Sequence, residues 1–221
     1  MLEERIKSLK KEIINYASLV EVMIEKSIQG LVKRQKELLK EVIEKDEEKA
    51  NEMEMKIEEH CIETLAQFEP RAKDLRLIVA ALKMNNDLER MADHAVNIAG
   101  NASFLIELPR EAFIEEILTM AEKTKKMLKD SVDSFIEGDT QKAEDVCKRD
   151  DEVDELQDKI IKALVSNMCV EPDSLASIDQ RVHLLIIAKN LERIADLSTN
   201  ICEDTIYLEK GKDIKHHRGF K

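Results

Sequence analysis

Turn-forming and aromatic residues are scarce in this chain. Its 221 residues include five glycines, three prolines and no tryptophan, and only 3% of them are aromatic. So few glycines and prolines leave little material for turns, and the abundance of Leu, Ile, Glu, Lys, Ala and Met is typical of long helices. The length suffices for one or two ordinary hydrophobic cores. The composition therefore predicts an all-α protein built from a few long helices.

Other absences bear on location and partners. No run approaches the roughly 18 apolar residues of a membrane span, and the N-terminus lacks the apolar segment of a secretory signal. The cysteines form no CxxC pair, which predicts buried thiols in a reducing compartment; they are Cys61, Cys147, Cys169 and Cys202. A net charge of −12 argues against nucleic acid as a partner and favours cations. We expect a cytoplasmic protein that meets a membrane only through its partners.

One stretch of the sequence occurs twice. LERMADHAVNI at residues 88–98 returns as LERIADLSTNI at residues 191–201, a shift of 103 with seven of eleven positions identical. Four of the identical positions are polar, namely one Glu, one Arg, one Asp and one Asn in each copy. A repeat at a fixed shift predicts two halves with the same architecture.

Helical spacing of apolar residues and a few turn signals divide the chain into six segments. Gly138-Asp139 marks one break, Glu69-Pro70 and Glu171-Pro172 mark two more, and Pro109 begins a further helix. The repeat transfers the break at Gly138 to residues 35–36. The expected helices cover residues 2–34, 36–68, 71–106, 109–137, 139–169 and about 174–210.

Six long helices in two sets of three, joined by short turns, imply a specific architecture. We predict two tandem antiparallel three-helix bundles, residues 1–107 and 108–210, followed by a flexible polar tail, residues 211–221. Each bundle is expected to bury its own apolar stripes. Because the joint near Leu108-Pro109 is short, the two bundles are expected to be fixed relative to each other.

Each copy of the repeated stretch carries a Glu and an Asp four residues apart. Residues at this spacing lie nearly in line on a helix, so Glu89 and Asp93 are neighbours, as are Glu192 and Asp196. At 100° per residue both pairs continue an apolar stripe. The aligned apolar residues are Leu75, Ile78 and Leu82 in the first half, and Ile178 and Leu185 in the second. These carboxylates are therefore expected to face inward.

A second acidic set lies in the preceding helix of each half. It consists of Asp150 and Asp154 in the second half, and its counterparts in the first half are Glu47 and Asn51. Both sets lie about twenty residues from the Glu-Pro turn that separates the two helices. At about 1.5 Å per residue, antiparallel helices bring the two sets to the same height. Each half should therefore hold two such pairs across one helix–helix contact.

Carboxylates that converge on an apolar stripe repel one another and lose hydration unless a cation neutralises them. Paired carboxylates on two helices are typical of metal sites in helical bundles. Hard oxygen ligands favour iron, manganese, magnesium or calcium, with zinc a further candidate. Asn97 and Asn200, one turn beyond the acid pairs, are candidate accessory ligands through their amide oxygens. Asn51 makes the first of the two sites less anionic.

Two other interpretations stay open. The acids could be structural, paired with Arg90 and Arg193 in salt bridges between helices. Alternatively, the sites could form a carboxylate-bridged di-metal oxidase or hydrolase. Against an enzyme, His94 and His183 lie off the acidic stripes, and the sequence shows neither a nucleophile with its base nor a glycine-rich phosphate loop.

At these residues the chain resembles the PhoU family of phosphate-uptake regulators. The resemblance covers essentially residues 1–210 and is carried by DLRLIVAALKMNNDLERMADHAVNI at 74–98, AKNLERIADLSTNICE at 188–203, and the acidic segments EEKANEM and DDEVDEL. Ala92 and Ala195 stand where the family often has glycine. Leu197 and Ser198 replace a His-Ala pair of many members, so no histidine ligand is expected there.

This resemblance implies a cytoplasmic regulator without catalytic activity. Members of the family couple a phosphate ABC transporter to a sensor histidine kinase and repress the phosphate-starvation response when phosphate is plentiful. Several carry metal clusters at E/DxxxD motifs, and homodimers are common. On this chain the motifs correspond to Glu47-Asn51 with Glu89-Asp93, and to Asp150-Asp154 with Glu192-Asp196. The prediction is a metal-binding adaptor between the transporter ATPase and the kinase.

Overall fold

The computed structural model describes residues 1–109, 114–168 and 175–211, and within these ranges the chain is helical and has no strand. The helices are α1 (Leu2–Lys33), α2 (Lys36–Glu41), a π-helical turn η1 (Val42–Asp46), α3 (Glu47–Phe68), α4 (Ala72–Leu105), α5 (Ile114–Glu137), α6 (Thr140–Met168) and α7 (Leu175–Lys210). Because α2, η1 and α3 follow one another without a break, they correspond to the single helix expected over 36–68. The all-α prediction is confirmed.

The turns form where the sequence signals predict them. Arg34 and Glu69 adopt left-handed conformations, with φ of 54° and 43°, and end α1 and α3. Gly138 has φ of 71° and ends α5, a conformation that glycine adopts without a steric penalty. The Asp139 side chain then caps α6, since its Oδ1 accepts two backbone N–H bonds of 3.0 Å from the first turn. The expected helix start at residue 109 adjoins a segment outside the described residues. The expected break at 171–172 falls within another such segment.

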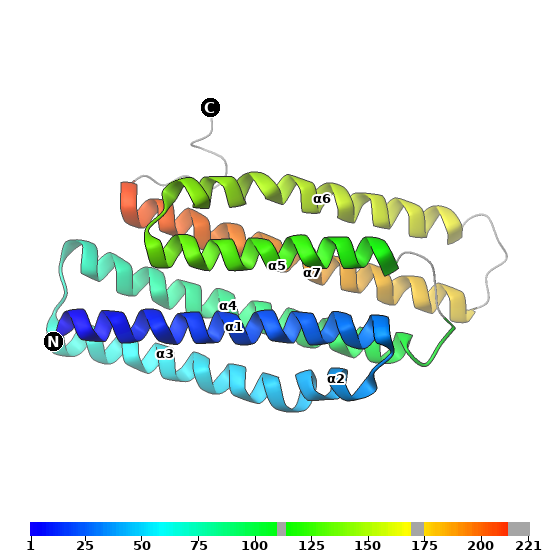
Figure 1. The fold of residues 1–221 in the computed structure, drawn as a ribbon, viewed down its shortest axis with the longest axis horizontal. Helices are drawn as coiled ribbons and strands as arrows, with labels where there is room; N and C mark the ends of the chain where they lie inside the picture. Colours follow the sequence, from blue (N-terminus) through cyan, green and yellow to red (C-terminus); the bar gives the residue numbers. More distant parts are fainter. Residues whose placement is uncertain (110–113, 169–174, 212–221) are drawn as a thin grey trace.

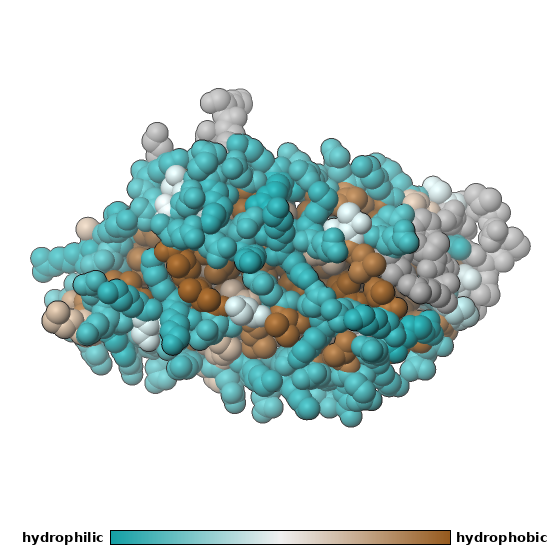
Figure 2. All heavy atoms as spheres, in the orientation of Figure 1, coloured by the Kyte–Doolittle hydropathy of each residue, from teal (hydrophilic) through white to brown (hydrophobic). Residues whose placement is uncertain are grey.

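The two halves pack side by side along their length (Figure 1). In the first half α1 contacts α3 and α4, and in the second half α5 contacts α6 and α7. The halves meet where α4 packs on α7 and where α1 packs on α5. Figure 2 shows one face of the molecule, on which hydrophobic residues appear between ridges of hydrophilic ones. The two bundles are therefore in extensive contact and are not joined by the linker alone.

The hydrophobic core differs from the one expected. Buried residues of all the long helices form one continuous cluster that crosses from the first half to the second. The expectation that each bundle buries its apolar stripes within itself is wrong in this respect. The reason is that α4 and α7 are central helices with neighbours on both sides, so their buried surfaces extend into the contact between the halves. The boundary between the two bundles, placed between residues 107 and 108, thus remains a prediction from the repeat.

The π-helical turn η1 changes the register of the repeat. Before it, the buried residues Leu39 and Val42 match Ala143 and Val146 at a shift of 104. After it, buried residues match at a shift of 103, as Ala50 matches Val153. The first half therefore contains one extra residue between these points, and a single wide turn accommodates it. Such turns are often found at functional sites.

Three further predictions can be compared with the described residues. Among these helices, none has both the length and the apolar character that crossing a membrane requires. Cys61 and Cys202 are buried as expected, whereas Cys147 is half-buried. Cys169 lies outside the described residues, as does the expected flexible tail apart from residue 211.

Candidate functional site

The four acids of the second half lie at the contact between α6 and α7. Asp150 and Asp154 belong to α6, and Glu192 and Asp196 belong to α7. Burial raises the pKa of Asp150 to about 7, and the charges of Asp196, Asp154 and Glu192 add to the effect. Burial also raises the pKa of Asp196 to about 6, followed by the charges of Glu192 and Asp154. The four carboxylates are therefore close enough for their negative charges to repel one another.

Little in the described structure compensates this negative charge. Asp150 Oδ1 is buried and has no hydrogen-bond partner. Lys189 pairs with Glu192 on its own helix at 2.6 Å, and Asp154 has a pKa raised by burial and by Glu192. A buried carboxylate oxygen without a donor is costly, because it has lost water and gained nothing in exchange. The chemistry of these donors suits a hard cation, which would satisfy that oxygen and offset the repulsion if the side chains closed around it.

The salt-bridge interpretation makes a prediction that the structure does not meet. It requires Arg90 and Arg193 to contact acids of a neighbouring helix. Neither arginine forms an ion pair within 4.0 Å in the described ranges, and both side chains are exposed. The acids are thus not neutralised by the arginines of the repeated stretch. At the same time, no three His, Cys, Asp or Glu side chains among the described residues are close enough together to chelate an ion.

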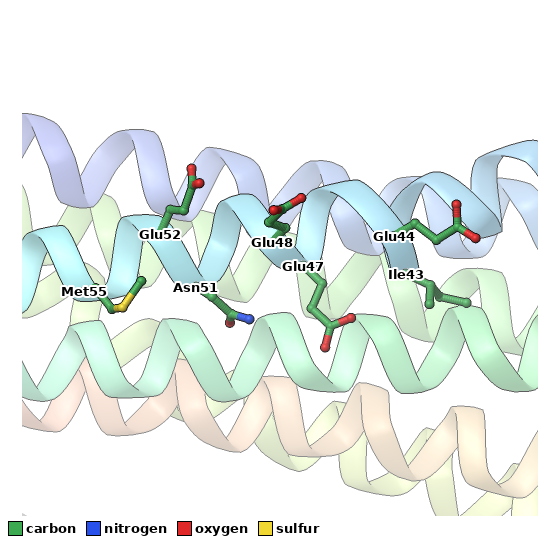
Figure 3. Close-up of a pocket in the computed structure, with 7 residues that line it drawn as sticks. All are labelled: Ile43, Glu44, Glu47, Glu48, Asn51, Glu52 and Met55. Atoms are coloured by element: carbon green, nitrogen blue, oxygen red, sulfur yellow. The ribbon is translucent and has the colours of Figure 1, made fainter.

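In the first half the acids are arranged differently. Glu89 is half-buried on α4, and its pKa is raised by burial, then by Asp93 and Glu54. Figure 3 shows Glu47 and Asn51 of α3 directed toward α4 along the same stretch. Both line a shallow depression over α3, and Asn51 is exposed. The sequence predicted Glu47 and Asn51 as the partners of Glu89 on α3, whereas the acid of α3 whose charge raises the pKa of Glu89 is Glu54, one turn further along.

The π-helical turn explains why the first pair on α3 is not a simple copy of the second half. At the shift of 104 that holds before the turn, Asp46 and not Glu47 corresponds to Asp150. Asp46 is only 1% exposed and is paired with Lys26 at 2.7 Å. Its charge is therefore already compensated within the core. Glu47, displaced by the extra residue, is half-buried and points toward α4.

The stripe that carries the acids is only partly a core stripe. Ile78 is fully buried, and Leu82 and Leu185 are half-buried. Leu75 and Ile178, also expected to face inward with the acids, are 41% and 39% exposed. Glu89 and Glu192 are half-buried, while Asp93 and Asp196 are exposed. Asp93 and Asp196 line the groove between α4 and α7, and Glu192 lines a depression together with Asp154 of α6. The acids are therefore reachable from solvent, as an exchangeable ion would need.

The two copies of the repeated stretch form a groove between α4 and α7. Its volume is about 520 Å³, and its lining consists of matched residues from both copies: Arg90, Asp93, His94 and Asn97 with Arg193, Asp196, Leu197 and Asn200. Asn97 and Asn200, the candidate accessory ligands, thus line this groove. His94 Nδ1 donates a 2.9 Å hydrogen bond to Asn190 Oδ1 of α7, so it links the halves. The interpretation of His94 as an ordinary helix residue agrees with this contact.

Apolar residues stand at both ends of the same two helices. Leu75 and Val79 begin α4, and at the shift of 103 their counterparts Ile178 and Val182 begin α7. Phe104 ends α4 and Tyr207 ends α7, also matched at 103. All six side chains are exposed. Since α4 and α7 run in opposite directions, each end of this face has two aliphatic residues and one aromatic ring beside the charged middle (Figure 1).

Comparison with known proteins supports the resemblance to the PhoU family over nearly the whole chain. The model of the PhoU domain matches twice, at residues 13–102 and 117–205. Two similar relatives are phosphate-specific transport system accessory protein PhoU homologs. The one from Clostridium acetobutylicum is 37% identical over 97% of this chain and 96% of its own length. The one from Aquifex aeolicus is 39% identical, with the same shares covered.

Solved structures agree with the sequence relatives. The crystal structure of PhoU from Pseudomonas aeruginosa superposes with a TM-score of 0.90 at 28% identity, covering 96% of this chain and all of that one. The phosphate transport system regulatory protein PhoU from Streptococcus pneumoniae gives 0.89 at 27% identity, covering 97% of this chain and all of the other. With the domain matched in both halves and curated relatives matched over nearly their full length, this chain belongs to the PhoU family.

Proposed function

We propose that this chain regulates phosphate uptake as an accessory protein of a phosphate transport system. Its curated relatives carry that description over nearly their full length, and they are named as accessory proteins, not enzymes. The observation that carries the proposal is the duplication of α4 in α7: matched charged residues of the repeated stretch line the groove between the two helices, and matched apolar residues are exposed toward their ends. Such a face is suited to binding other proteins, and no catalytic residues are required for that role.

The finer proposal is an adaptor that binds metal. In the second half Asp150, Asp154, Glu192 and Asp196 would hold the ion, and in the first half Glu89 and Asp93 would do so with acids of α3. A bound iron, manganese, magnesium, calcium or zinc ion supplies positive charge that removes the repulsion among these carboxylates. The chain's own contribution is to hold the acids at matching heights on two helices. The consequence is a tighter and more rigid face on α4 and α7.

The partners we propose are the ATPase of a phosphate ABC transporter and a sensor histidine kinase, with the chain acting in the cytoplasm as a negative regulator and assembling as a homodimer. Contact with the membrane would then be indirect. Exposed apolar residues at both ends of the α4–α7 face offer anchoring positions, and the charged middle offers specificity. Burying these ends against a partner removes apolar surface from water, which favours association.

The test measures binding of the purified chain to the cytoplasmic part of the kinase and to the ATPase, with and without added Mn²⁺. The double variant Val79→Ser/Val182→Ser should weaken binding, because it removes a matched aliphatic residue from each end of the face. A control pair of apolar residues on other helices that are at least as exposed, Met55→Ser/Val165→Ser, should leave it unchanged. If both pairs have the same effect, the α4–α7 face is not the docking surface.

A further inference from the structure

Two thiols meet where α6 packs on α7. Cys147 belongs to α6 and Cys202 to α7, and their side chains are in hydrogen-bonding contact. Cys147 packs against the hydrophobic core, and Cys202 is part of that core with 0% exposure. The other cysteine in the described ranges, Cys61, is buried on α3 in the first half. Folding thus brings together two thiols that are far apart in the sequence.

The register of the two helices places these thiols at one height. α6 and α7 run in opposite directions (Figure 1). Toward the start of α6, Glu144 Oε1 lies 2.7 Å from Lys210 Nζ of α7. Toward its middle lie the acids of the second half, whose charges act on one another across the same helix–helix contact. Cys147 and Cys202 both lie between these two points, so helix geometry brings them level independently of their own contact.

The residues one turn before the two cysteines are small. They are Ala143 on α6 and Ser198 on α7, and both are fully buried. Short side chains let two helix backbones approach each other closely. A disulfide requires such an approach, since it joins residues whose Cα atoms are within about 7 Å of each other. This stretch of the α6–α7 contact is therefore suited to a covalent cross-link.

The pair of thiols has no copy in the first half. At the shift of 104 Cys147 corresponds to Ile43, and at the shift of 103 Cys202 corresponds to Ala99. Ile43 and Ala99 also pack in the hydrophobic core, so packing at these positions does not require sulfur. A free cysteine packs like a small apolar residue, and its reactivity is what distinguishes it. The pair therefore indicates a chemical role.

The two sulfurs differ in access and in chemistry. Cys147 is half-buried, so a small oxidant reaches it from solvent. Burial, followed by the hydrogen bond with Cys147 and its charge, raises the pKa of Cys202, which keeps this thiol unreactive on its own. The Ser134 hydroxyl and the Arg149 charge act in the opposite direction on the pKa of Cys202. An accessible thiol with a second thiol beside it is the arrangement of a redox-sensitive pair.

We propose that Cys147 and Cys202 form a reversible disulfide in response to a peroxide. Cys147 Sγ attacks hydrogen peroxide, the O–O bond breaks, and Cys147 becomes a sulfenic acid while one water is released. Cys202 Sγ then attacks the Cys147 sulfur. The S–S bond forms, the S–O bond breaks, and hydroxide leaves with the Cys202 proton as a second water. Two thiols are thus oxidised by two electrons, and one peroxide is reduced to two waters.

The disulfide fastens α6 to α7. α6 is the outer helix of the second half and packs on α5 and α7 (Figure 1). Cys147 lies less than one turn from Asp150, so the cross-link holds α6 in place beside the acids. It also stabilises the fold, mainly by restricting the unfolded chain. Cellular thiols such as glutathione reverse it by exchange. This site goes beyond the proposed regulatory function and does not depend on metal binding.

Peptide mapping of the oxidised chain tests the pairing directly. The folded protein is treated with hydrogen peroxide, its remaining thiols are blocked with N-ethylmaleimide in denaturant, and it is digested with trypsin without reductant. The two cysteines fall in separate tryptic peptides, residues 143–148 and 194–210. We expect these peptides to be joined with the loss of two hydrogens, and to separate on addition of dithiothreitol. Cys61 is the internal control and should carry the maleimide.

Two variants separate the roles of the thiols. In Cys202→Ala the sulfenic acid has no thiol to react with, so dimedone should label Cys147 there and not in the parent chain. In Cys147→Ala the buried Cys202 should stay reduced under the same treatment. The urea midpoint of the parent chain should rise on oxidation and return with dithiothreitol, whereas neither variant should show the rise. Far-UV circular dichroism verifies that both variants are folded.

The mapping of the parent chain also defines the results that contradict the proposal. If Cys147 is oxidised to a sulfinic or sulfonic acid without any linked peptide, the two thiols do not react with each other. If Cys147 is joined to residues 163–181, which carry Cys169, or to a second copy of the chain, its partner is not Cys202. If Cys147 stays reduced in a peroxide concentration that oxidises free glutathione, the pair is structural and does not respond to peroxide.

Discussion

Asp150 is the residue at which buried charge has its clearest consequence in this molecule. Its pKa of about 7, against an ordinary value of 3.8, means that the folded chain binds a proton there that the unfolded chain has already released. The folded state therefore binds more protons between about pH 4 and 7, and the free energy of unfolding must fall as the pH rises through that window. Asp196, with a pKa of about 6, acts in the same direction.

This linkage predicts how the metal-free chain responds to pH. We expect the urea midpoint of unfolding to be higher at about pH 5.5 than at about pH 7.5, and Asp150→Asn should reduce the difference by removing the titrating group. Glu155→Gln, an exposed acid of the same helix, serves as the control and should keep the difference. A midpoint that rises with pH in the parent chain but not in Asp150→Asn would show that this carboxyl is stabilised by ionisation.

Sequence reasoning at this scale predicted the neighbours of Asp150 better than those of Glu89. Two spacings of four residues and one count of residues from a turn bring Asp154, Glu192 and Asp196 near Asp150, because helix geometry is regular there. Glu54 and Tyr16 could not be found in this way, since their nearness to Glu89 depends on tertiary contacts among three helices. The signal that a reader of the sequence could have used was Asn51, an amide where the repeat has an acid.

At the scale of helices, the breaks were predictable and the wide turn was not. Glu69-Pro70 and Gly138-Asp139 have residue types that stop a helix for known steric reasons. The segment VIEKD of η1 contains neither glycine nor proline, and every residue in it is compatible with an ordinary helix. Its π geometry arises because one inserted residue must be absorbed while the buried positions on both sides keep their places. Only packing, not local preference, determines such a turn.

Two glycines inside helices provide a test at this scale. A Cβ at Gly30 would lie 2.6 Å from Leu39 Cγ and closer still to Leu39 Cδ2, and Leu39 is fully buried. A Cβ at Gly100 would meet nothing within 4 Å. Gly100→Ala should stabilise the chain by roughly 0.5–1 kcal/mol through helix propensity. Gly30→Ala should destabilise it, since overpacking costs about 1–3 kcal/mol and exceeds that gain.

Denaturant unfolding of both variants under the same conditions measures these effects. The opposite signs are the informative result, because the chemical change is identical and only the neighbouring side chain differs. If Gly30→Ala were as stable as Gly100→Ala, α1 and α2 would approach each other less closely than the structure indicates.

At the scale of the whole molecule, the repeat predicted two halves and the core joins them. The sequence could not show this, because the buried residues at the α4–α7 contact have the same helical spacing as those that pack within a bundle. Hydrogen bonds between polar side chains reinforce this contact, as between His183 Nδ1 and Asn101 Oδ1 at 2.6 Å. His183 also stacks on Phe104, with ring centroids 4.1 Å apart. The two halves should therefore behave as one folding unit.

Metal addition provides the first test of the whole molecule. An ion that binds the folded chain and not the unfolded one stabilises it, by about 2.7 kcal/mol when its concentration is a hundred times the dissociation constant. We expect Mn²⁺ to raise the thermal midpoint of the parent chain, and a chelator to reverse the change. Asp150→Asn/Glu192→Gln should lose a large part of this increase. An equal increase in parent and variant would place the stabilising ion away from the α6–α7 acids.

The two tyrosines test whether the halves unfold together. Tyr16 belongs to the first half and Tyr207 to the second, so Tyr207→Phe and Tyr16→Phe each leave one reporter. Because one core crosses between the halves, the urea transition of each reporter should coincide with the far-UV circular dichroism of the same variant. Independent halves would instead give two steps in circular dichroism, with each tyrosine following only one. In that case the contact between α4 and α7 would contribute little free energy, and an ion bound in one half would have no effect on the stability of the other.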